Sequence, residues 1–137
     1  MYRLIESIKV VNWQLQNTTY HNERLNRSRK ELFGIQDAAD LSELVMMPAD
    51  LDSGTYKCRV VYSEIVHSIE FLPYIPRQIN SLRLVTADDI NYSYKFQDRN
   101  NFKELMKIIA EDEILVVKNG FITDTSFSNI IFFDGLN

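Results

Sequence analysis

The strongest constraint in this sequence is an Asn-Gly dipeptide between two apolar runs near its C-terminal end. Asn119-Gly120 follows the run 114–117 and precedes the run 121–123. Both central residues of a two-residue hairpin turn need positive φ, which Asn and Gly adopt readily, so the pattern predicts a β-hairpin. A polar cluster at 124–129 and a second apolar run at 130–133 follow. Polar loops between buried strands often carry functional residues, so this loop is the first candidate site.

The composition is that of a folded protein with one domain, or with a small domain and part of another. Of 137 residues, 45% are hydrophobic and 12% aromatic, enough for a packed core. Nineteen acidic residues against fifteen basic ones leave a net charge of -4, which argues against general binding to nucleic acid. There is neither an apolar run of membrane-spanning length nor a signal-peptide pattern. With Cys58 as the single cysteine, we expect a cytoplasmic protein without membrane partners.

The N-terminal part of the sequence predicts a hairpin followed by a basic helix. Apolar residues indicate a strand over residues 2–11, which Asn12 can turn back into a short second strand. Thr18 or Thr19 can cap a helix over residues 20–33, and the glycine after it suits the end of a helix. Of the basic residues on this helix, Arg24 is nearest the apolar face and is therefore the one most able to point inward.

The rest of the chain mixes strands and helices without repeated βαβ units, so the predicted fold class is α+β. We expect a small N-terminal α+β domain over residues 1–73, a linker over 74–80, and part of a second domain over 81–137. The remaining predicted elements are a short helix over 38–47, strands over 56–62, 65–71 and 82–85, and a helix over 99–110 capped by Asp98.

Considered without any family resemblance, the sequence gives only weak indications of a catalytic or metal-binding site. The four glycines form no phosphate-binding loop, and the sequence contains neither HExxH nor CxxC, so we expect no metal site. Cys58 falls on the apolar side of an alternating strand and is most simply a core residue. Lys95, just before a predicted helix, and Asp124 in the polar loop stand out. On these grounds alone, a solvated lysine in an unrelated α+β domain remains an open interpretation.

Three segments nevertheless form an ordered pattern. His21-Asn22-Glu23-Arg24-Leu25 with Ser28 is similar to H-x-x-R-L-x-x-S, and Tyr94-Lys95-Phe96-Gln97-Asp98-Arg99 is similar to K-x-x-N-R. The segment from Gly120 to Ile130 is similar to G-x-[IV]-T-E-x-S-x-S-N-[IL]. In this order they resemble the fold-type IV pyridoxal-phosphate enzymes, which include the class IV aminotransferases and aminodeoxychorismate lyase. The resemblance covers nearly the whole chain, and its third segment is the most specific.

The resemblance implies pyridoxal 5'-phosphate as cofactor and a role for each matched residue. Lys95 would be the catalytic residue, which forms the Schiff base with the cofactor and moves the α-proton. Asp124 stands where the family has glutamate and would pair with the pyridine nitrogen, keeping it protonated. Arg24 would bind the phosphate through its planar guanidinium. The remaining cofactor-binding candidates are Arg99, near the ring, and Ser128 and Asn129, which with Ser126 would shape the loop.

The implied function is transamination, or the related lyase reaction, on a small amino acid or aminodeoxychorismate, by a homodimer. Two departures from the family matter. Asp124 is one methylene shorter than glutamate, and family members continue through a further phosphate-binding segment, whereas this sequence stops at Asn137 just after a second turn signal, Asp134-Gly135. We therefore expect a shortened member that lacks the C-terminal part of the large domain. The alternative is a non-catalytic remnant that acts as a dimeric binding module.

Overall fold

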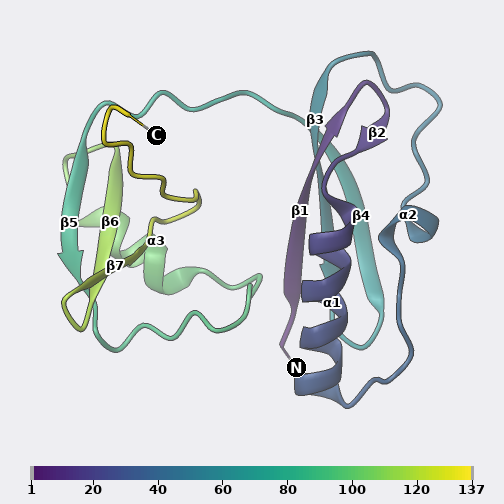
Figure 1. Cartoon of the computed structure of the whole chain (residues 1–137), viewed down its shortest axis with the longest axis horizontal. Coiled ribbons are helices and arrows are strands. Elements are labelled where there is room, and N and C mark those ends of the chain that lie inside the picture. The colour runs from purple at the N-terminus through teal and green to yellow at the C-terminus, as the bar shows by residue number, and fades with distance from the viewer. Residues whose placement is uncertain (1, 137) are drawn as a thin grey trace. The chain divides into compact units, whose positions relative to one another are not determined.

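The computed structural model describes residues 2–136, and Met1 and Asn137, the ends of the predicted domains, lie outside the described residues. The chain forms two compact units (Figure 1). The first comprises the residues up to Pro76 together with Ser93–Asp98, and the second comprises Arg77–Tyr92 together with the residues from Arg99 onward. The segment Ser93–Asp98, which the sequence division left in the second domain, thus belongs with the first unit.

The first unit is an antiparallel sheet covered on one face by a long helix. Its strands are β1 (Leu4–Val11), β2 (Gln14–Leu15), β3 (Thr55–Tyr62) and β4 (Val66–Pro73), in the order β2-β1-β3-β4. The helices are α1 (Thr18–Phe33) and the one-turn α2 (Leu41–Leu44). The predicted opening hairpin is confirmed, since Asn12 and Trp13 both have positive φ at its turn.

Alternation along these strands builds the core of the first unit. Leu4, Ile8 and Val10 of β1 are fully buried, and they pack with buried residues of β3 and of α1. Cys58 is one of them and is 0% exposed, so its prediction as a core residue is confirmed, and burial raises the pKa of its thiol to about 11. The core residues of this unit are Leu4, Ile8, Val10, Leu25, Leu41, Val45, Cys58, Val60 and Tyr62.

The N-terminal cap of α1 differs from the prediction, whereas its C-terminal end matches it. Helix α1 already includes Thr18, and its N-cap is Asn17 in the left-handed conformation without a side-chain cap bond, so the predicted threonine cap is wrong. Asn tolerates positive φ better than Thr, which is β-branched. Gly34 ends the helix with φ +72°, as predicted, and its N–H bonds to the carbonyls of Arg29 and Lys30.

The second unit is a three-stranded sheet with one helix against it. Its strands are β5 (Leu82–Thr86), β6 (Glu113–Lys118) and β7 (Phe121–Asp124), in the order β5-β6-β7, and its helix is α3 (Asn100–Lys107). Strand β5 pairs with β6 in parallel, and α3 lies between them in the chain. The predicted hairpin is confirmed, because β6 and β7 are antiparallel with Asn119 and Gly120 both at positive φ. Helix α3 starts at Asn100 with Arg99 at its N-cap, so the predicted Asp98 cap is wrong.

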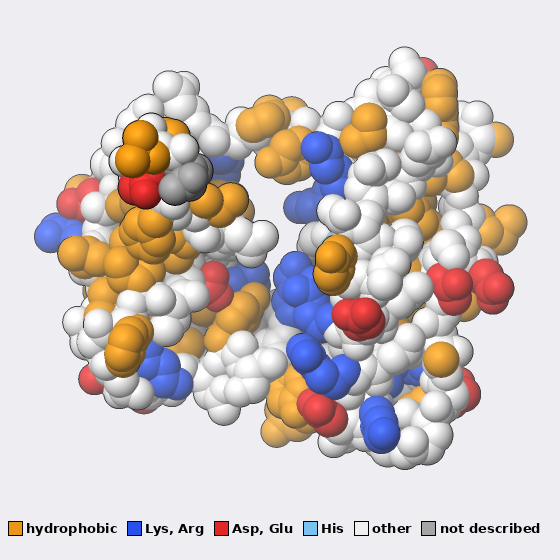
Figure 2. All heavy atoms as spheres, in the orientation of Figure 1, with side chains coloured by type: hydrophobic (Ala, Val, Ile, Leu, Met, Phe, Trp, Pro, Cys, Tyr) orange, Lys and Arg blue, Asp and Glu red, His pale blue; other side chains and the backbone are white. Residues whose placement is uncertain are grey.

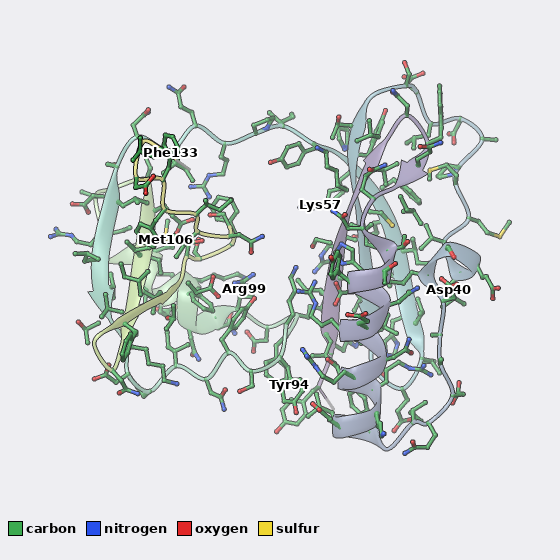
Figure 3. All side chains as sticks on the ribbon, in the orientation of Figure 1. Asp40, Lys57, Tyr94, Arg99, Met106 and Phe133 are labelled. Atoms are coloured by element: carbon green, nitrogen blue, oxygen red, sulfur yellow. The ribbon has the colours of Figure 1, made fainter. Side chains whose placement is uncertain are left out.

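The second apolar run after the polar loop does not form a strand. Ile131 is 91% exposed, and Phe132 and Phe133 are each 72% exposed; Figure 3 labels Phe133 on this segment. The expectation of a buried strand over residues 130–133 is therefore wrong. A strand needs a partner for its backbone groups, and among the described residues β7 pairs only with β6.

We expect the double substitution Ile131→Ser and Phe132→Ser to leave stability nearly unchanged, because both side chains are already exposed. The free energy of unfolding should change by less than about 0.5 kcal/mol. The control Ile114→Ala, at a fully buried position, should cost about 3 kcal/mol. Urea denaturation measures both, and a loss above about 1 kcal/mol in the double variant would show that this segment packs against the unit.

The mixed architecture of sheets with a few helices confirms the predicted α+β class. Among residues 2–136, no helix has the length and apolar character needed to cross a membrane.

Candidate functional site

The polar loop after β7 is held by one fully buried carboxylate that the sequence analysis did not single out. Glu113, the first residue of β6, is 0% exposed. Its Oε1 accepts a hydrogen bond from the backbone N–H of Ser126 at 3.1 Å, and its Oε2 accepts one from the Ser126 hydroxyl at 2.8 Å. The N–H of Ile114 donates to the same Oε1 at 2.8 Å. A buried acid needs such donors, so Glu113 fixes the loop to the start of β6.

A second set of bonds closes the loop on itself. Thr125 is 5% exposed, and its hydroxyl donates to the carbonyl of Ser128 at 2.7 Å while accepting from the Ser128 N–H at 2.8 Å. The two hydroxyls also lie 2.9 Å apart. Ser128 is therefore built into the loop, whereas the side chain of Asn129 next to it is exposed. Both keep their proposed loop-shaping role as a prediction.

Asp124 lies where β7 ends and this loop begins. It pairs with Val116 of β6 and is half-buried. Its Oδ1 accepts a hydrogen bond from the N–H of Thr125 at 2.8 Å. The carboxylate is thus oriented by the same ordered loop that Glu113 holds in place.

Lys95 belongs to a strand-like segment that lies beside the start of β1. Its carbonyl accepts from the N–H of Ile5 at 2.9 Å, and Phe96 forms an antiparallel bridge with Leu4. Phe96 packs against the core on the α1 side of the sheet. The Phe96 N–H also donates to the Tyr94 carbonyl at 3.0 Å, so Lys95 is the central residue of a tight turn beside β1.

Tyr94 shares the α1 side with Phe96. Its hydroxyl donates to Glu31 of α1 at 2.9 Å, and Figure 3 shows its ring close to that helix. This bond raises the pKa of the phenol. Tyr94 and Phe96 therefore hold the backbone on either side of Lys95 against the first unit.

Arg24 takes part in a cluster around a second buried carboxylate, Glu6 of β1, which we call the Glu6 cluster. Arg24 Nε donates to Glu6 Oε1 at 2.7 Å, and its terminal nitrogen donates to Oε2, while His21 Nδ1 lies 2.6 Å from Oε2. Glu6 is fully buried, and the Arg24 side chain is 37% exposed. Burial alone would raise the pKa of Glu6, but the hydrogen bonds from Arg24 and His21 outweigh it and hold that pKa below its ordinary value.

Arg99 lies against aromatic rings at the start of α3 (Figure 3). Its guanidinium carbon is 5.0 Å from the ring centroid of Tyr92 and 4.9 Å from that of Phe102. These are cation–π distances, so the two rings set the position of this side chain.

The predicted site residues divide between the two units. Arg24 and Lys95 lie in the first; Arg99, Asp124, Ser128 and Asn129 lie in the second. Sequence reasoning missed Glu6 and Glu113. Glu6 had a readable signal, because it shares the alternation of Leu4, Ile8 and Val10 and so belongs on the core face. Among the described residues, no three His, Cys, Asp or Glu side chains come together as a metal site.

Comparison with known proteins gives two relatives, while no family model matches the chain. The chain is 33% identical over 138 residues to an uncharacterized protein of Haemophilus influenzae strain Rd, a match that spans 98% of this chain and 73% of the relative. The crystal structure of a "putative 4-amino-4-deoxychorismate lyase" from Haemophilus somnus 129PT matches with a TM-score of 0.80 and 26% sequence identity. That match covers 94% of this chain and 70% of the solved one.

Proposed function

Because the chain belongs to the same family as the Haemophilus influenzae protein and has an aminodeoxychorismate lyase-like fold, we propose that it is a pyridoxal-phosphate-dependent lyase acting on 4-amino-4-deoxychorismate. The observation that carries this proposal is the structural likeness, with a TM-score of 0.80 over 94% of the chain. The substrate is taken from the name of the Haemophilus somnus protein. The order of the three motif segments supports the same assignment.

The side chains present match the groups that pyridoxal phosphate needs. Lys95 offers an amine for the aldehyde, Asp124 a carboxylate for the pyridine nitrogen, and Arg24 a guanidinium for the phosphate. The Asp124 carboxylate has the fixed orientation that such pairing requires, through its bond from Thr125. Each of these three side chains therefore has the chemistry that suits the cofactor group it would hold.

In this proposal each residue has a separate task. When bound, pyridoxal phosphate supplies an electron sink for the carbon that carries the substrate amine. Lys95 would hold the cofactor through Nζ and move a proton at that atom, which requires the neutral amine. Asp124 would keep a proton on the ring nitrogen of the cofactor. Because the Glu113-bound loop fixes its backbone, the carboxylate does so without reorganisation.

The test is cofactor binding. Purified protein titrated with pyridoxal phosphate should develop the visible absorbance band of a lysine-bound cofactor, and Lys95→Ala should abolish it. Saturating cofactor at about 100 times its Kd should stabilise the wild type by about 2.7 kcal/mol and leave Lys95→Ala with less. Lys103→Ala, at an exposed position of α3, is the matched control and should behave as wild type.

The non-catalytic alternative makes the opposite prediction for the same measurements. A remnant would fold, develop no band at saturating cofactor, and melt at the same temperature with Lys95 or alanine at this position. That set of results would end the enzymatic proposal. A band together with turnover of 4-amino-4-deoxychorismate would end the alternative.

A further inference from the structure

The candidate lysine lies on a loop whose two ends are both in the second unit. That unit includes Arg77–Tyr92 and the residues from Arg99 onward, whereas Ser93–Asp98 belongs to the first unit. We call Ser93–Asp98 the lysine loop, because it carries Lys95. The residues that flank the loop therefore belong to one unit, and the loop between them belongs to the other.

Backbone hydrogen bonds fix the middle of the lysine loop in the first unit. The carbonyl of Lys95 accepts from the N–H of Ile5 at 2.9 Å, and the N–H of Gln97 donates to the carbonyl of Arg3 at 2.8 Å. Each of these amides loses its partner when the loop leaves β1. The amides of Ile5 and Gln97 consequently report whether the loop is docked.

A cation–π contact closes the base of the lysine loop. The guanidinium carbon of Arg99 lies 5.0 Å from the centroid of the Tyr92 ring. An extended chain between these two positions would reach about 25 Å. The contact therefore holds the two ends of the loop together, and we call the Tyr92–Arg99 pair the clamp.

A third aromatic residue anchors the clamp in the core of the second unit. The guanidinium carbon of Arg99 is 4.9 Å from the ring centroid of Phe102. The rings of Phe102 and Tyr92 meet edge to face, with 5.3 Å between their centroids. Phe102 is 5% exposed and packs with Ile114 and Val116 of β6. The base of the loop is thus attached to a packed core, and Figure 3 labels Arg99 beside α3.

The Arg99 side chain keeps its place through these rings and not through a hydrogen bond of its Nε. Among residues 2–136, the buried Nε of Arg99 has no hydrogen-bond partner. Arg29, a buried arginine of the first unit, instead donates to the carbonyls of Asp37 and Glu64. A buried N–H without an acceptor costs stability, so its presence in a native protein needs an explanation.

We propose that Arg99 is a positioning residue for Lys95. By closing the base of the lysine loop with Tyr92, it reduces the conformations open to the loop, so Lys95 meets the cofactor aldehyde already ordered. This rests on the proposed function, in which Lys95 holds the cofactor. Arg99 then acts through Lys95, in place of the direct contact with the cofactor ring that the family resemblance implies.

Amide hydrogen exchange of the cofactor-free protein tests the clamp directly. In Arg99→Gln, the amides of Ile5 and Gln97 should exchange about fivefold faster, the factor by which loss of a cation–π contact changes an equilibrium constant. Amides of the β5–β6 ladder should exchange as in wild type, which separates opening of the loop from unfolding of the second unit. Arg99→Lys keeps a cation at this position and should recover part of the protection.

The partner of Arg99 provides an independent variant. Tyr92→Leu should accelerate exchange at Ile5 and Gln97 to the same extent, and it carries the test if Arg99→Gln does not fold. Because the two residues act through one contact, the double variant Tyr92→Leu/Arg99→Gln should exchange no faster than either single variant. Phe133→Leu is the matched control, because it removes a 72% exposed ring from the C-terminal segment, where Figure 2 shows hydrophobic side chains at the surface. It should leave exchange unchanged.

Cofactor affinity is the second readout. The Kd for pyridoxal phosphate, read from its absorbance band, should rise about fivefold in Arg99→Gln, and Arg99→Lys should restore part of the affinity. Lys103→Gln removes a cation from an exposed position of the same helix and should leave the Kd as in wild type. If no band forms in any variant, the proposed function has failed, whereas exchange in the cofactor-free protein still decides whether the clamp orders the loop.

Three results would contradict the positioning role. Unchanged exchange at Ile5 and Gln97 together with a raised Kd in Arg99→Gln would assign Arg99 to direct contact with the cofactor. Equal acceleration in the β5–β6 ladder would show that Arg99 only stabilises the second unit. Effects of Arg99→Gln and Tyr92→Leu that add up in the double variant would show that the two residues do not act as one clamp.

Discussion

Glu6→Ala should lower the free energy of unfolding of the first unit by about 3 kcal/mol, the largest effect we expect from any polar substitution there. Glu6 is fully buried beneath α1 and accepts from both Arg24 and His21. Its removal leaves a cavity and takes the hydrogen-bond acceptor from Arg24 and His21, whose side chains stay partly buried. The 37% exposure of Arg24 lets water replace some of the lost interaction, which keeps the cost near the lower end for a buried pair.

The same cluster predicts how stability depends on acidity. The folded-state pKa of Glu6 lies below its ordinary value of 4.5, so the unfolded chain binds a proton there before the folded one does. The contribution of Glu6 is therefore complete above about pH 4.5 and is lost as pH falls through the lowered pKa. Glu6→Ala should flatten this part of the stability profile.

Urea denaturation at neutral and at acidic pH checks both expectations. Glu70→Gln is the matched control, because it removes a carboxylate that also contacts an arginine but is 52% exposed. It should cost less than about 0.5 kcal/mol. Equal losses from Glu6→Ala and Glu70→Gln would mean that the buried cluster contributes nothing beyond a surface pair.

The second large effect is expected from Glu113→Ala in the second unit. This substitution removes the acceptor for three donors, the N–H and hydroxyl of Ser126 and the N–H of Ile114. Each buried donor left unpaired costs about 1–3 kcal/mol. The loop can reopen and expose its donors to water, which lowers this cost. We therefore expect the free energy of unfolding to fall by about 3 kcal/mol in all. The loop that orients Asp124 should also lose its order.

Amide hydrogen exchange separates these two consequences. Protection of the Ser126 and Ser128 amides should fall in Glu113→Ala more than protection of the β5–β6 ladder does. Affinity for pyridoxal phosphate should fall with it, because the Asp124 carboxylate loses its fixed position. The control Glu104→Gln changes a 68% exposed residue of α3 and should leave both measurements as in wild type. Unchanged exchange at Ser126 in Glu113→Ala would refute the anchoring role.

Much of the local structure could be predicted from the sequence because its signals are local. The Asn119-Gly120 turn, the alternation around Cys58 and the Gly34 helix end each depend on neighbouring residues, and the structure confirms all three. The pairing of strands that are far apart in the sequence cannot be predicted from neighbouring residues. The segment 130–133 reads as a buried strand by composition, but its exposure depends on whether another strand lies beside it.

The candidate site shows the same limit. The motif resemblance singled out Arg24, Lys95 and Asp124. It did not single out Glu6, which binds Arg24, or Glu113, which fixes the loop after Asp124. Their side-chain donors come from far along the chain, 15 to 18 residues away for Glu6 and 13 for Glu113. The position of Lys95 beside β1 depends on the bridge between Phe96 and Leu4, which no spacing around Lys95 reveals.

The return of Ser93–Asp98 to the edge of β1 has a consequence for how the protein is made. The bridge from Phe96 to Leu4 joins the first strand to a residue that leaves the ribosome after all of β5. The first unit therefore cannot finish folding as an independent N-terminal domain during synthesis, and its last strand-like segment docks only when the start of the second unit already exists. Such a contact between distant residues slows folding. A fragment that ends at Pro76 should consequently keep an open edge at the start of β1 and be prone to aggregate.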